Sequence, residues 1–391
     1  MGFQALLSRE DYYGILKGTL QRYYTQRYGN GIKVGYEPEP DAAELIMNPR
    51  LGMIFRPCPP KRPRNYLYRS YNIRGNIVKN IAAKAFVFLS THSRNLFTMP
   101  RKLYVYPADM IKKNTMICYL NRSIRIFDFE DGKTISIQKE TFTSKYFQNQ
   151  LQFRNDNKYD FIPSITAFGE DWFEENILDG KSLARETDEQ KYSVGEHQAL
   201  ISVLELAKAT REQVDSRAYI TEISECCKKQ LTRAQDTKGI TTFNEASNYL
   251  DFLGIVLAHV PEILPLAESH GDLQAGNIWL EGAKTWIIDW ETHAKRSIWF
   301  DITTLVFGTR YYGGIRKLTS KLKEDGLKDT MLQGQQCDWN VHLMVALFLL
   351  EDFLFYLEDM MELPGQGGKE SFDIYMKELF EINWRQIFDK A

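Results

Sequence analysis

Three side chains suited to phosphoryl transfer lie close together in one stretch, SHGDLQAGNIWLEGAKTWIIDWE. Asp272 precedes Asn277 by five positions, and the apolar run TWII leads into Asp289 twelve positions after Asn277. A carboxylate can accept a hydrogen bond from an attacking hydroxyl, while an amide oxygen and a second carboxylate are hard ligands that suit magnesium. Because such a transfer mainly needs an oriented hydroxyl and metal-bridged phosphate oxygens, we expect Asp272 to act as the base and Asn277 and Asp289 to bind Mg2+.

A compact sheet is predicted upstream of these residues. From Thr115 the sequence alternates with period two through TMICYL, SIRIFDF and TISIQKE, which two tight turns join into a meander. The second turn contains Asp131-Gly132, a pair typical of hairpins. A helix from about Phe142 to Arg154 and the strand-like runs FIPSITAFGED and WFEENILDGKSL follow. We therefore expect a small lobe of five strands and one helix.

The rest of the chain is predicted to be mostly helical. Helical patterns cover residues 194–233 and 243–259 and several segments from Lys317 to the end, whereas Ser269 to Thr309 is strand-like and loop-like. The most apolar run, residues 343–363, is interrupted by the acidic pairs 351–352 and 358–359, which would be costly in a membrane, so we interpret it as a core helix. Together these patterns predict an α+β fold with an antiparallel-sheet lobe and a helical lobe.

The motif HGDLQAGN resembles the catalytic loop His-x-Asp-x-x-x-x-Asn of the aminoglycoside phosphotransferase and choline kinase superfamily, small-molecule kinases with a protein-kinase-like fold. IIDWE resembles the metal-binding strand end of that group. Protein kinases normally have Phe-Gly after this aspartate and then a long activation segment, but here Trp290 and Glu291 follow. Only eleven residues separate Asp289 from Asp301 in SIWFDITTL, which leaves little room to dock a peptide and disfavours protein phosphorylation.

The resemblance implies a two-lobed fold, an activity and a domain plan. Residues 1–113 would be an N-terminal extension of unknown role, 114–178 the N-lobe and hinge, and 179–391 the helical C-lobe with the catalytic loop. The enzyme would be a phosphotransferase with an alcohol group as acceptor, using Mg2+ and ATP or GTP. Its substrate would be a small molecule such as a sugar, an amino-sugar or a choline-like alcohol.

The resemblance also implies roles for further residues. Asp301 would order the catalytic loop through backbone amides, and His270 would shape the same loop. Lys139 falls where the third strand of the group has its phosphate-binding lysine, because Ile137 and Lys139 point to the same face. The backbone of the linker between the lobes would contact adenine at Glu175, Asn176, Ile177 and Leu178.

Two departures from the family pattern are the reason to keep an alternative function beside the kinase. The helix that should offer a glutamate to Lys139 has Gln148, Gln150 and Gln152 instead, which would give only a weaker neutral contact. The first turn, residues 121–123, has no glycine to let a loop close over phosphates. The alternative is a catalytically weak, kinase-like nucleotide-binding regulator or scaffold.

Composition limits the partners. A net charge of -2 provides no global field for nucleic acid, and the basic stretch RPCPPKRPR at 56–64 is interpreted as a solvated linker rather than a polyanion site. A protein partner could bind through the N-terminal module.

Five scattered cysteines favour a reduced, cytoplasmic setting. The paired acids 351–352 and 358–359 could bind an amine substrate, although we favour a solvated acidic helix face. Lys295 and Arg296 argue as readily for an anionic or sugar substrate.

Overall fold

The computed structural model describes residues 10–71, 77–92, 97–142, 145–323, 326–363, 365–366 and 368–388. The chain divides into two compact units, one formed by Met1–Glu196 with Ile278–Ile288 and the other by His197–Asn277 with Asp289–Ala391. The first is built on an antiparallel sheet and the second is mainly helical, which confirms the predicted two-lobed α+β fold class.

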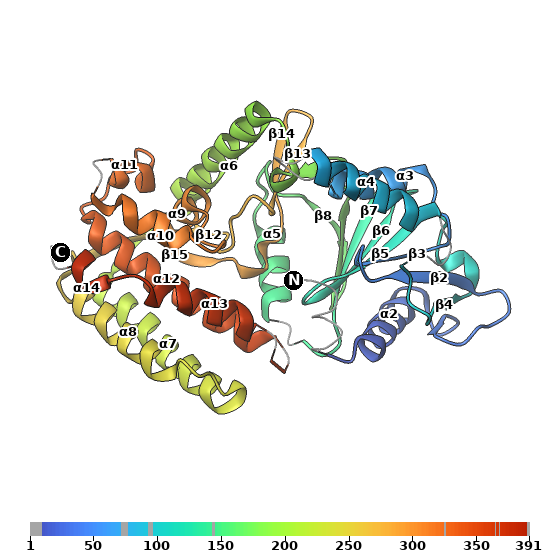
Figure 1. Ribbon diagram of the computed structural model, residues 1–391, viewed down its shortest axis with the longest axis horizontal. Helices are drawn as coiled ribbons and strands as arrows, with labels where there is room; N and C mark the ends of the chain where they lie inside the picture. Colours follow the sequence, from blue (N-terminus) through green and yellow to red (C-terminus); the bar gives the residue numbers. More distant parts are fainter. Residues whose placement is uncertain are drawn as a thin grey trace. The chain divides into compact units, whose positions relative to one another are not determined.

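The first unit contains a nine-stranded sheet in the order β1-β4-β2-β3-β5-β6-β7-β9-β8 (Figure 1). Its strands are β1 Lys33–Gly35, β2 Ala43–Asn48, β3 Met53–Phe55, β4 Leu103–Tyr106, β5 Thr115–Tyr119, β6 Ser123–Asp128, β7 Lys133–Gln138, β8 Ile165–Phe168 and β9 Trp172–Asn176. The predicted meander is confirmed as β5 to β7. Strands β1 to β4 were not predicted, and they extend the same sheet. Neither residue 113 nor residue 178 is therefore a boundary between compact units.

Helices cover both faces of this sheet (Figure 1). They are α2 Tyr12–Tyr28, α3 Lys61–Ser70, α4 Ile77–His92 and α5 Lys145–Asp156. Successive strand residues point to opposite faces. Ile126 and Ile135 accordingly pack with α2, while Phe127 packs with α3. Ser136 lies opposite Phe173, which contacts α5, so α3 and α5 share the face that α2 does not cover.

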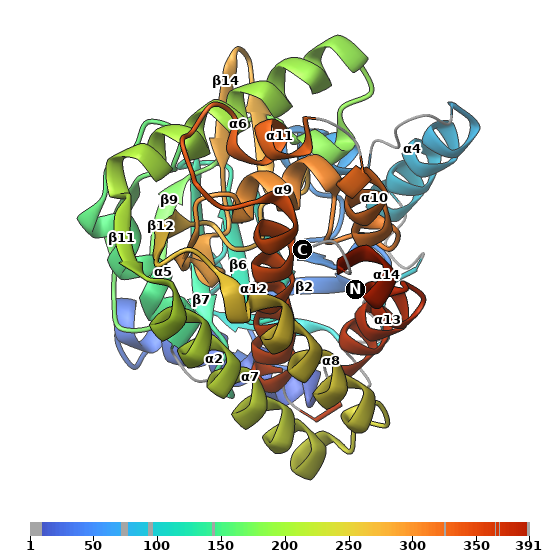
Figure 2. The ribbon, with the colours of Figure 1, turned by 90° about the vertical axis from the view of Figure 1, so that its left-hand side faces the viewer.

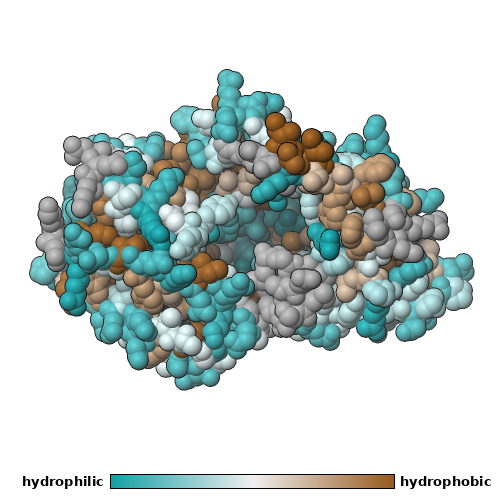
Figure 3. All heavy atoms as spheres, in the orientation of Figure 1, coloured by the Kyte–Doolittle hydropathy of each residue, from teal (hydrophilic) through white to brown (hydrophobic). Residues whose placement is uncertain are grey.

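Helix α4 presents apolar side chains to solvent. Ile77 and Val78 are 79% and 77% exposed, and Ile81 is also exposed on the following turn. Figure 3 shows hydrophobic atoms gathered over this helix on an otherwise largely hydrophilic face.

A long buried helix forms the centre of the second unit. Helix α12, Val341–Glu362, packs against α7, Ser216–Lys238, and α8, Phe243–Val256 (Figure 2). Its middle section from Leu343 to Phe353 is buried throughout, which confirms the predicted core helix. No helix in the described part of the chain is long and apolar enough to cross a membrane.

The predicted helix 194–233 is interrupted. Helix α6, Glu189–Thr210, ends before β11, Glu212–Asp215, and α7 starts afresh at Ser216. Asp215 caps α7, since its Oδ1 accepts a hydrogen bond from the backbone N–H of Ala218 at 2.7 Å. Strand β11 pairs with β12, Ile263–Ser269, which pairs in turn with β15, Ala294–Ser297. This small sheet positions the loop described next.

Candidate active site

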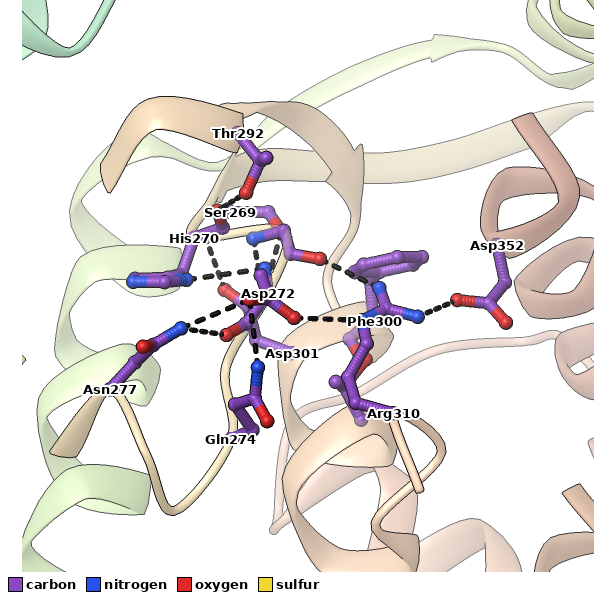
Figure 4. Close-up of polar contacts among 12 residues, drawn as sticks. Ser269, His270, Asp272, Gln274, Asn277, Thr292, Phe300, Asp301, Arg310 and Asp352 are labelled. Carbon is purple, nitrogen blue, oxygen red and sulfur yellow. Dashed lines mark hydrogen bonds and ion pairs between the residues drawn. The ribbon is translucent and has the colours of Figure 1, made fainter. Parts of the chain in front are cut away.

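The loop after β12 is held by Asp301 in the first turn of α9, Phe300–Phe307. Asp301 Oδ2 accepts a hydrogen bond from the backbone N–H of His270 at 2.6 Å. Its Oδ1 accepts bonds from the Gly271 N–H and the Ser269 hydroxyl, both at 3.0 Å (Figure 4). Three donors from consecutive residues converge on one buried carboxylate. The start of the loop is therefore fixed to α9.

His270 and Gly271 shape the same loop. The His270 side chain is fully buried against the ring of Trp290, and its Nδ1 accepts the backbone N–H of Asp272 at 3.2 Å. Gly271 has φ of +85°, and a Cβ built there would lie 2.4 Å from the carbonyl oxygen of Thr292. Glycine is thus required both by the backbone conformation and by the lack of space. These constraints turn the chain so that the side chain of Asp272 is only partly buried, with 23% of it exposed.

Asp272 and Asn277 are in direct contact. The Asn277 Nδ2 donates to the Asp272 backbone oxygen at 2.8 Å and to Asp272 Oδ2 at 3.1 Å, and the Gln274 side-chain amide also donates to Oδ2, at 2.9 Å (Figure 4). Because Asn277 uses its amino group in these bonds, its Oδ1 is the atom that can serve a ligand.

Asp289 follows the hairpin of β13, Ile278–Glu281, and β14, Lys284–Ile287. Its backbone is left-handed, with φ of 70° and ψ of 53°, a strained conformation for a residue other than glycine that is often found at functional sites. Burial raises the pKa of Asp272, the Arg310 guanidinium opposes this, and the Asp289 charge raises it further. The hairpin thus leads into Asp289, whose charge acts on the carboxylate of Asp272.

The donor set fits magnesium. Asn277 Oδ1 and the Asp289 carboxylate are both hard oxygen donors on partly exposed side chains. Among the described residues, no group of three or more His, Cys, Asp or Glu side chains could hold a metal ion unaided. Magnesium commonly binds to one or two protein ligands and completes its octahedron with water and phosphate oxygens. Asn277 and Asp289 would hold it in that manner.

Arg310 is the site residue that the sequence analysis missed. Its Nε donates to Asp272 Oδ1 at 3.1 Å and its Nη2 donates to the Gly271 carbonyl oxygen at 2.7 Å. Its Nη1 forms an ion pair with Asp352 of α12 (Figure 4). The guanidinium also lies over the ring of Phe355, and only 4% of the side chain is exposed. Arg310 is 38 positions from Asp272, and no local pattern marks it as a partner.

The first acidic pair of α12, Glu351 and Asp352, does not face solvent. Glu351 is buried and accepts bonds from the Ser297 N–H and hydroxyl and from the Tyr219 hydroxyl. Asp352 is also fully buried and is paired with Arg310. The interpretations of this pair as a solvated face and as an amine-binding surface are therefore both wrong.

The two basic residues after Asp289 are likewise engaged within the protein. Lys295 pairs with Glu212, and Arg296 is buried, with its Nη1 donating to the Thr292 carbonyl oxygen. The contacts of Lys295 and Arg296 therefore do not favour an anionic substrate over any other class of substrate.

Lys139 lies in the first unit, just beyond β7, on the side covered by α2. Its ammonium forms a buried ion pair with Glu10 at 2.8 Å, donates to the Asn121 carbonyl oxygen at 2.9 Å and lies over the ring of Tyr119. On the face shared with α5, the strand presents Ser136, whose hydroxyl accepts a bond from Arg125 Nε at 3.2 Å. A nucleotide-binding role for Lys139 stays a prediction.

The linker residues expected at adenine follow one another at the end of β9. Glu175 lies between Thr134 of β7 and Ile165 of β8, and its carboxylate pairs with Arg154 of α5. Asn176 is the last strand residue, and the N–H of Ile177 donates to the Gly132 carbonyl oxygen at 2.9 Å. Leu178 follows beyond the strand. These residues belong to the first unit, whereas Asp272, Asn277 and Asp289 belong to the second.

No protein-family model and no curated protein matches the sequence. Among solved structures, the chain is similar to a choline/ethanolamine kinase family protein from Mesorhizobium loti, with 15% identity, 70% of this chain and 90% of that chain covered, and a TM-score of 0.49. It is similar to an ethanolamine kinase of Plasmodium vivax, with 12% identity, 84% and 95% covered, and a TM-score of 0.48. It is also similar to aminoglycoside phosphotransferase APH(4)-Ia, with 12% identity, 71% and 94% covered, and a TM-score of 0.48. These proteins bear the names of the superfamily that the catalytic-loop motif resembles.

Proposed function

We propose that the protein transfers the terminal phosphoryl group of ATP or GTP to a hydroxyl of a small molecule, such as a sugar, an amino-sugar or a choline-like alcohol. The observation that carries the proposal is the arrangement of Asp272, Asn277 and Asp289. A loop pinned by Asp301 presents the first two in contact, and a strained residue after the hairpin adds the third.

Asp272 retains room for an acceptor hydroxyl. An ionised carboxylate offers about four lone-pair sites, and the bonds from Arg310, Gln274 and Asn277 occupy three of them. The remaining site can accept the hydroxyl proton as the phosphoryl group moves in line. Burial raises the pKa of Asp272 and so makes it a better proton acceptor than an exposed aspartate.

The other residues hold the reacting groups. Asn277 Oδ1 and Asp289 would hold magnesium, which would neutralise the charge on the phosphate. Arg310 holds the base in one orientation through Asp272 Oδ1 and the Gly271 carbonyl.

All five cysteines are unpaired, which agrees with the cytoplasmic setting that we propose.

The second candidate is a kinase-shaped nucleotide-binding regulator. The observation that favours it is the environment of Lys139, whose ammonium is already paired with Glu10, together with the glutamines of α5, of which Gln148 donates to the Glu170 carbonyl oxygen. Without a glutamate on α5 to orient Lys139 toward phosphate, phosphate positioning would be poor and turnover slow.

The test combines nucleotide binding with turnover. Calorimetry with ATP or GTP and magnesium, and phosphate release, are measured for the wild type, Asp272→Asn and Asp289→Ala. The control is Asp251→Asn on α8, where the aspartate is exposed and paired with Lys228. Asp272→Asn should lower turnover by about 10²-fold or more while nucleotide affinity stays unchanged. Asp289→Ala should weaken the magnesium-dependent part of the affinity.

The outcomes separate the two candidates. Asp272-dependent hydrolysis supports the kinase and justifies screening amino-sugars, choline-like amines and sugars as acceptors. Binding without any turnover supports the regulator. Equal turnover of the wild type and Asp272→Asn excludes Asp272 as the base.

A further inference from the structure

A cavity of about 470 Å³ lies in the first unit beside the linker that follows β9. On one side it is lined by Ile177 and Asp179 of the linker and by Phe129 and Gly132 at the turn between β6 and β7. Its volume falls within the range of about 300–1,000 Å³ typical of small-molecule sites. The linker thus has open space beside it large enough for a nucleobase and its sugar.

Another part of the cavity lining comes from α3, in the N-terminal part of the chain. Arg62, Asn65 and Arg69 recur at helical spacing on one face of α3, and Tyr68 lies beside them. The neighbouring Tyr66 and Leu67 are buried and pack instead on the sheet. The helix therefore has an apolar face for the sheet and a polar, basic face for the cavity.

Tyr66 fills the space deeper under the sheet. Its ring lies 5.0 Å from the ring of Phe127 and is stacked on Trp279 of β13 at 6.4 Å, with an angle of 19° between the planes. Ile177 and Trp279 both pack against this cluster. A planar ligand beside the linker must therefore lie on the cavity side of Tyr66.

The cavity is electropositive. Its lining contains two arginines and one carboxylate, Asp179, and α3 carries no acidic residue. Arg62 donates through Nη1 to the Phe129 carbonyl oxygen at 2.7 Å, which uses one of the five donors of its guanidinium. Arg69 holds Asp179. The arginines are thus positioned by the protein while Arg62 retains donors for an anion.

We propose that α3 forms one wall of the nucleotide site, with the base beside Tyr68 and the linker and the negative charge of the nucleotide facing Arg62 and Arg69. The inference rests on the proposed function, since it assigns the nucleotide of that reaction to this cavity. It gives the N-terminal segment a ligand-binding role, in which its arginines take over part of the phosphate binding that backbone N–H groups of a glycine-rich loop and a strand lysine would otherwise supply.

The test is calorimetric titration of the full chain with magnesium-ATP and magnesium-GTP. Arg62→Ala should weaken the nucleotide affinity about tenfold, the loss of one charge-assisted bond, and Arg62→Lys should restore part of it. The matched control is Arg64→Ala, which removes the same charge from the same helix at a position that contacts His92 and does not line the cavity. Its affinity should stay within about twofold of the wild type.

A second pair of variants tests the cavity without changing the charge of its arginines. Asn65→Trp should fill the space and abolish binding, whereas Lys61→Trp, an exposed position of α3 outside the lining, should not. Far-UV circular dichroism and thermal midpoints of all variants show whether they are folded.

The outcomes distinguish this inference from the proposed function. If Asp289→Ala weakens magnesium-dependent binding while Arg62→Ala and Asn65→Trp bind like their controls, the α3 site is wrong and the proposed function stands. If the α3 variants lose binding and no protein shows turnover, the α3 site stands and the regulator replaces the kinase. If the wild type binds neither nucleotide, both are overturned.

Discussion

Replacing Arg310 by methionine should expose how strongly the candidate base depends on its buried surroundings. The substitution keeps an apolar stem but removes the bonds to Asp272 Oδ1 and the Gly271 carbonyl oxygen and the ion pair with Asp352. Asp352 is fully buried, so it would lose its cation without gaining water. Breaking one side of a buried ion pair typically costs about 3–5 kcal/mol. We expect that loss in the free energy of unfolding at neutral pH.

The loss should depend on pH with a defined sign. Burial already raises the pKa of Asp352 and of Asp272, while Arg310 lowers both. Removing Arg310 therefore raises both pKa values further in the folded state. A folded-state pKa above the unfolded value means that stability falls as the pH rises from the unfolded value through the folded one. The variant should be closest to the wild type in acid, where Asp352 is protonated, and furthest from it at neutral pH.

The assay is urea unfolding of the wild type and Arg310→Met at about pH 5 and pH 7.5. The control is Arg316→Met, which removes an exposed arginine paired with Glu381 and should cost less than about 1 kcal/mol at both pH values. A loss at Arg310 that matches the control, or that is equal at the two pH values, would refute the reasoning. In the same variant, the acid limb of the turnover profile should move to higher pH, because the Asp272 base is protonated more readily.

Two further variants test how the loop is held. Asp301→Asn should lower the free energy of unfolding, measured in urea, by about 2–4 kcal/mol. The reason is that one amide oxygen cannot replace the two carboxylate oxygens that bind Ser269, His270 and Gly271. A loss below about 0.5 kcal/mol would contradict this. Gly271→Ala should lower the thermal midpoint of unfolding by more than Gly313→Ala. Both glycines have positive φ, but only at Gly271 would the added Cβ meet a carbonyl oxygen. Equal midpoints of the two variants would show that the loop moves aside.

The loop from Asp272 to Asn277 could be recognised in the sequence because its residues lie close together along the chain. Asp272 and Asn277 are five residues apart, and one short hairpin separates Asn277 from Asp289, so few backbone paths connect them. The meander was predictable for the same reason, since strict alternation and an Asp-Gly turn specify β6 and β7 within one hairpin.

Features set by distant contacts were not predictable. Arg310 contacts Asp272 and Asp352 because α9 and α12 pack together. Neither the spacing of these residues nor a local sequence pattern predicts the contact. Lys139 shows a related limit. Alternation correctly places it with Ile137, but the face that receives α2 is decided by packing with a helix that lies much earlier in the chain.

The strands of the N-terminal part were missed for a different reason. β1 and β3 have only three residues each, too short for alternation to be recognised, and β2 is buried at five of its six positions. A strand buried on both faces reads as a continuous apolar run rather than as a period of two. The intervening proline-rich and helical segments then made residues 1–113 look like a separate module, although the strands complete one sheet.

The buried network around Arg310 bears on the choice between enzyme and scaffold. A buried ion pair is a poor source of stability, because the cost of removing its charges from water can equal or exceed their attraction. Well-packed apolar residues would hold α9 against α12 at least as firmly. The network instead places a fixed positive charge against Asp272 and leaves one acceptor site on that carboxylate. A scaffold needs neither feature, whereas a base that must stay ionised while buried needs both, and the contacts of Arg310 therefore favour the catalytic proposal.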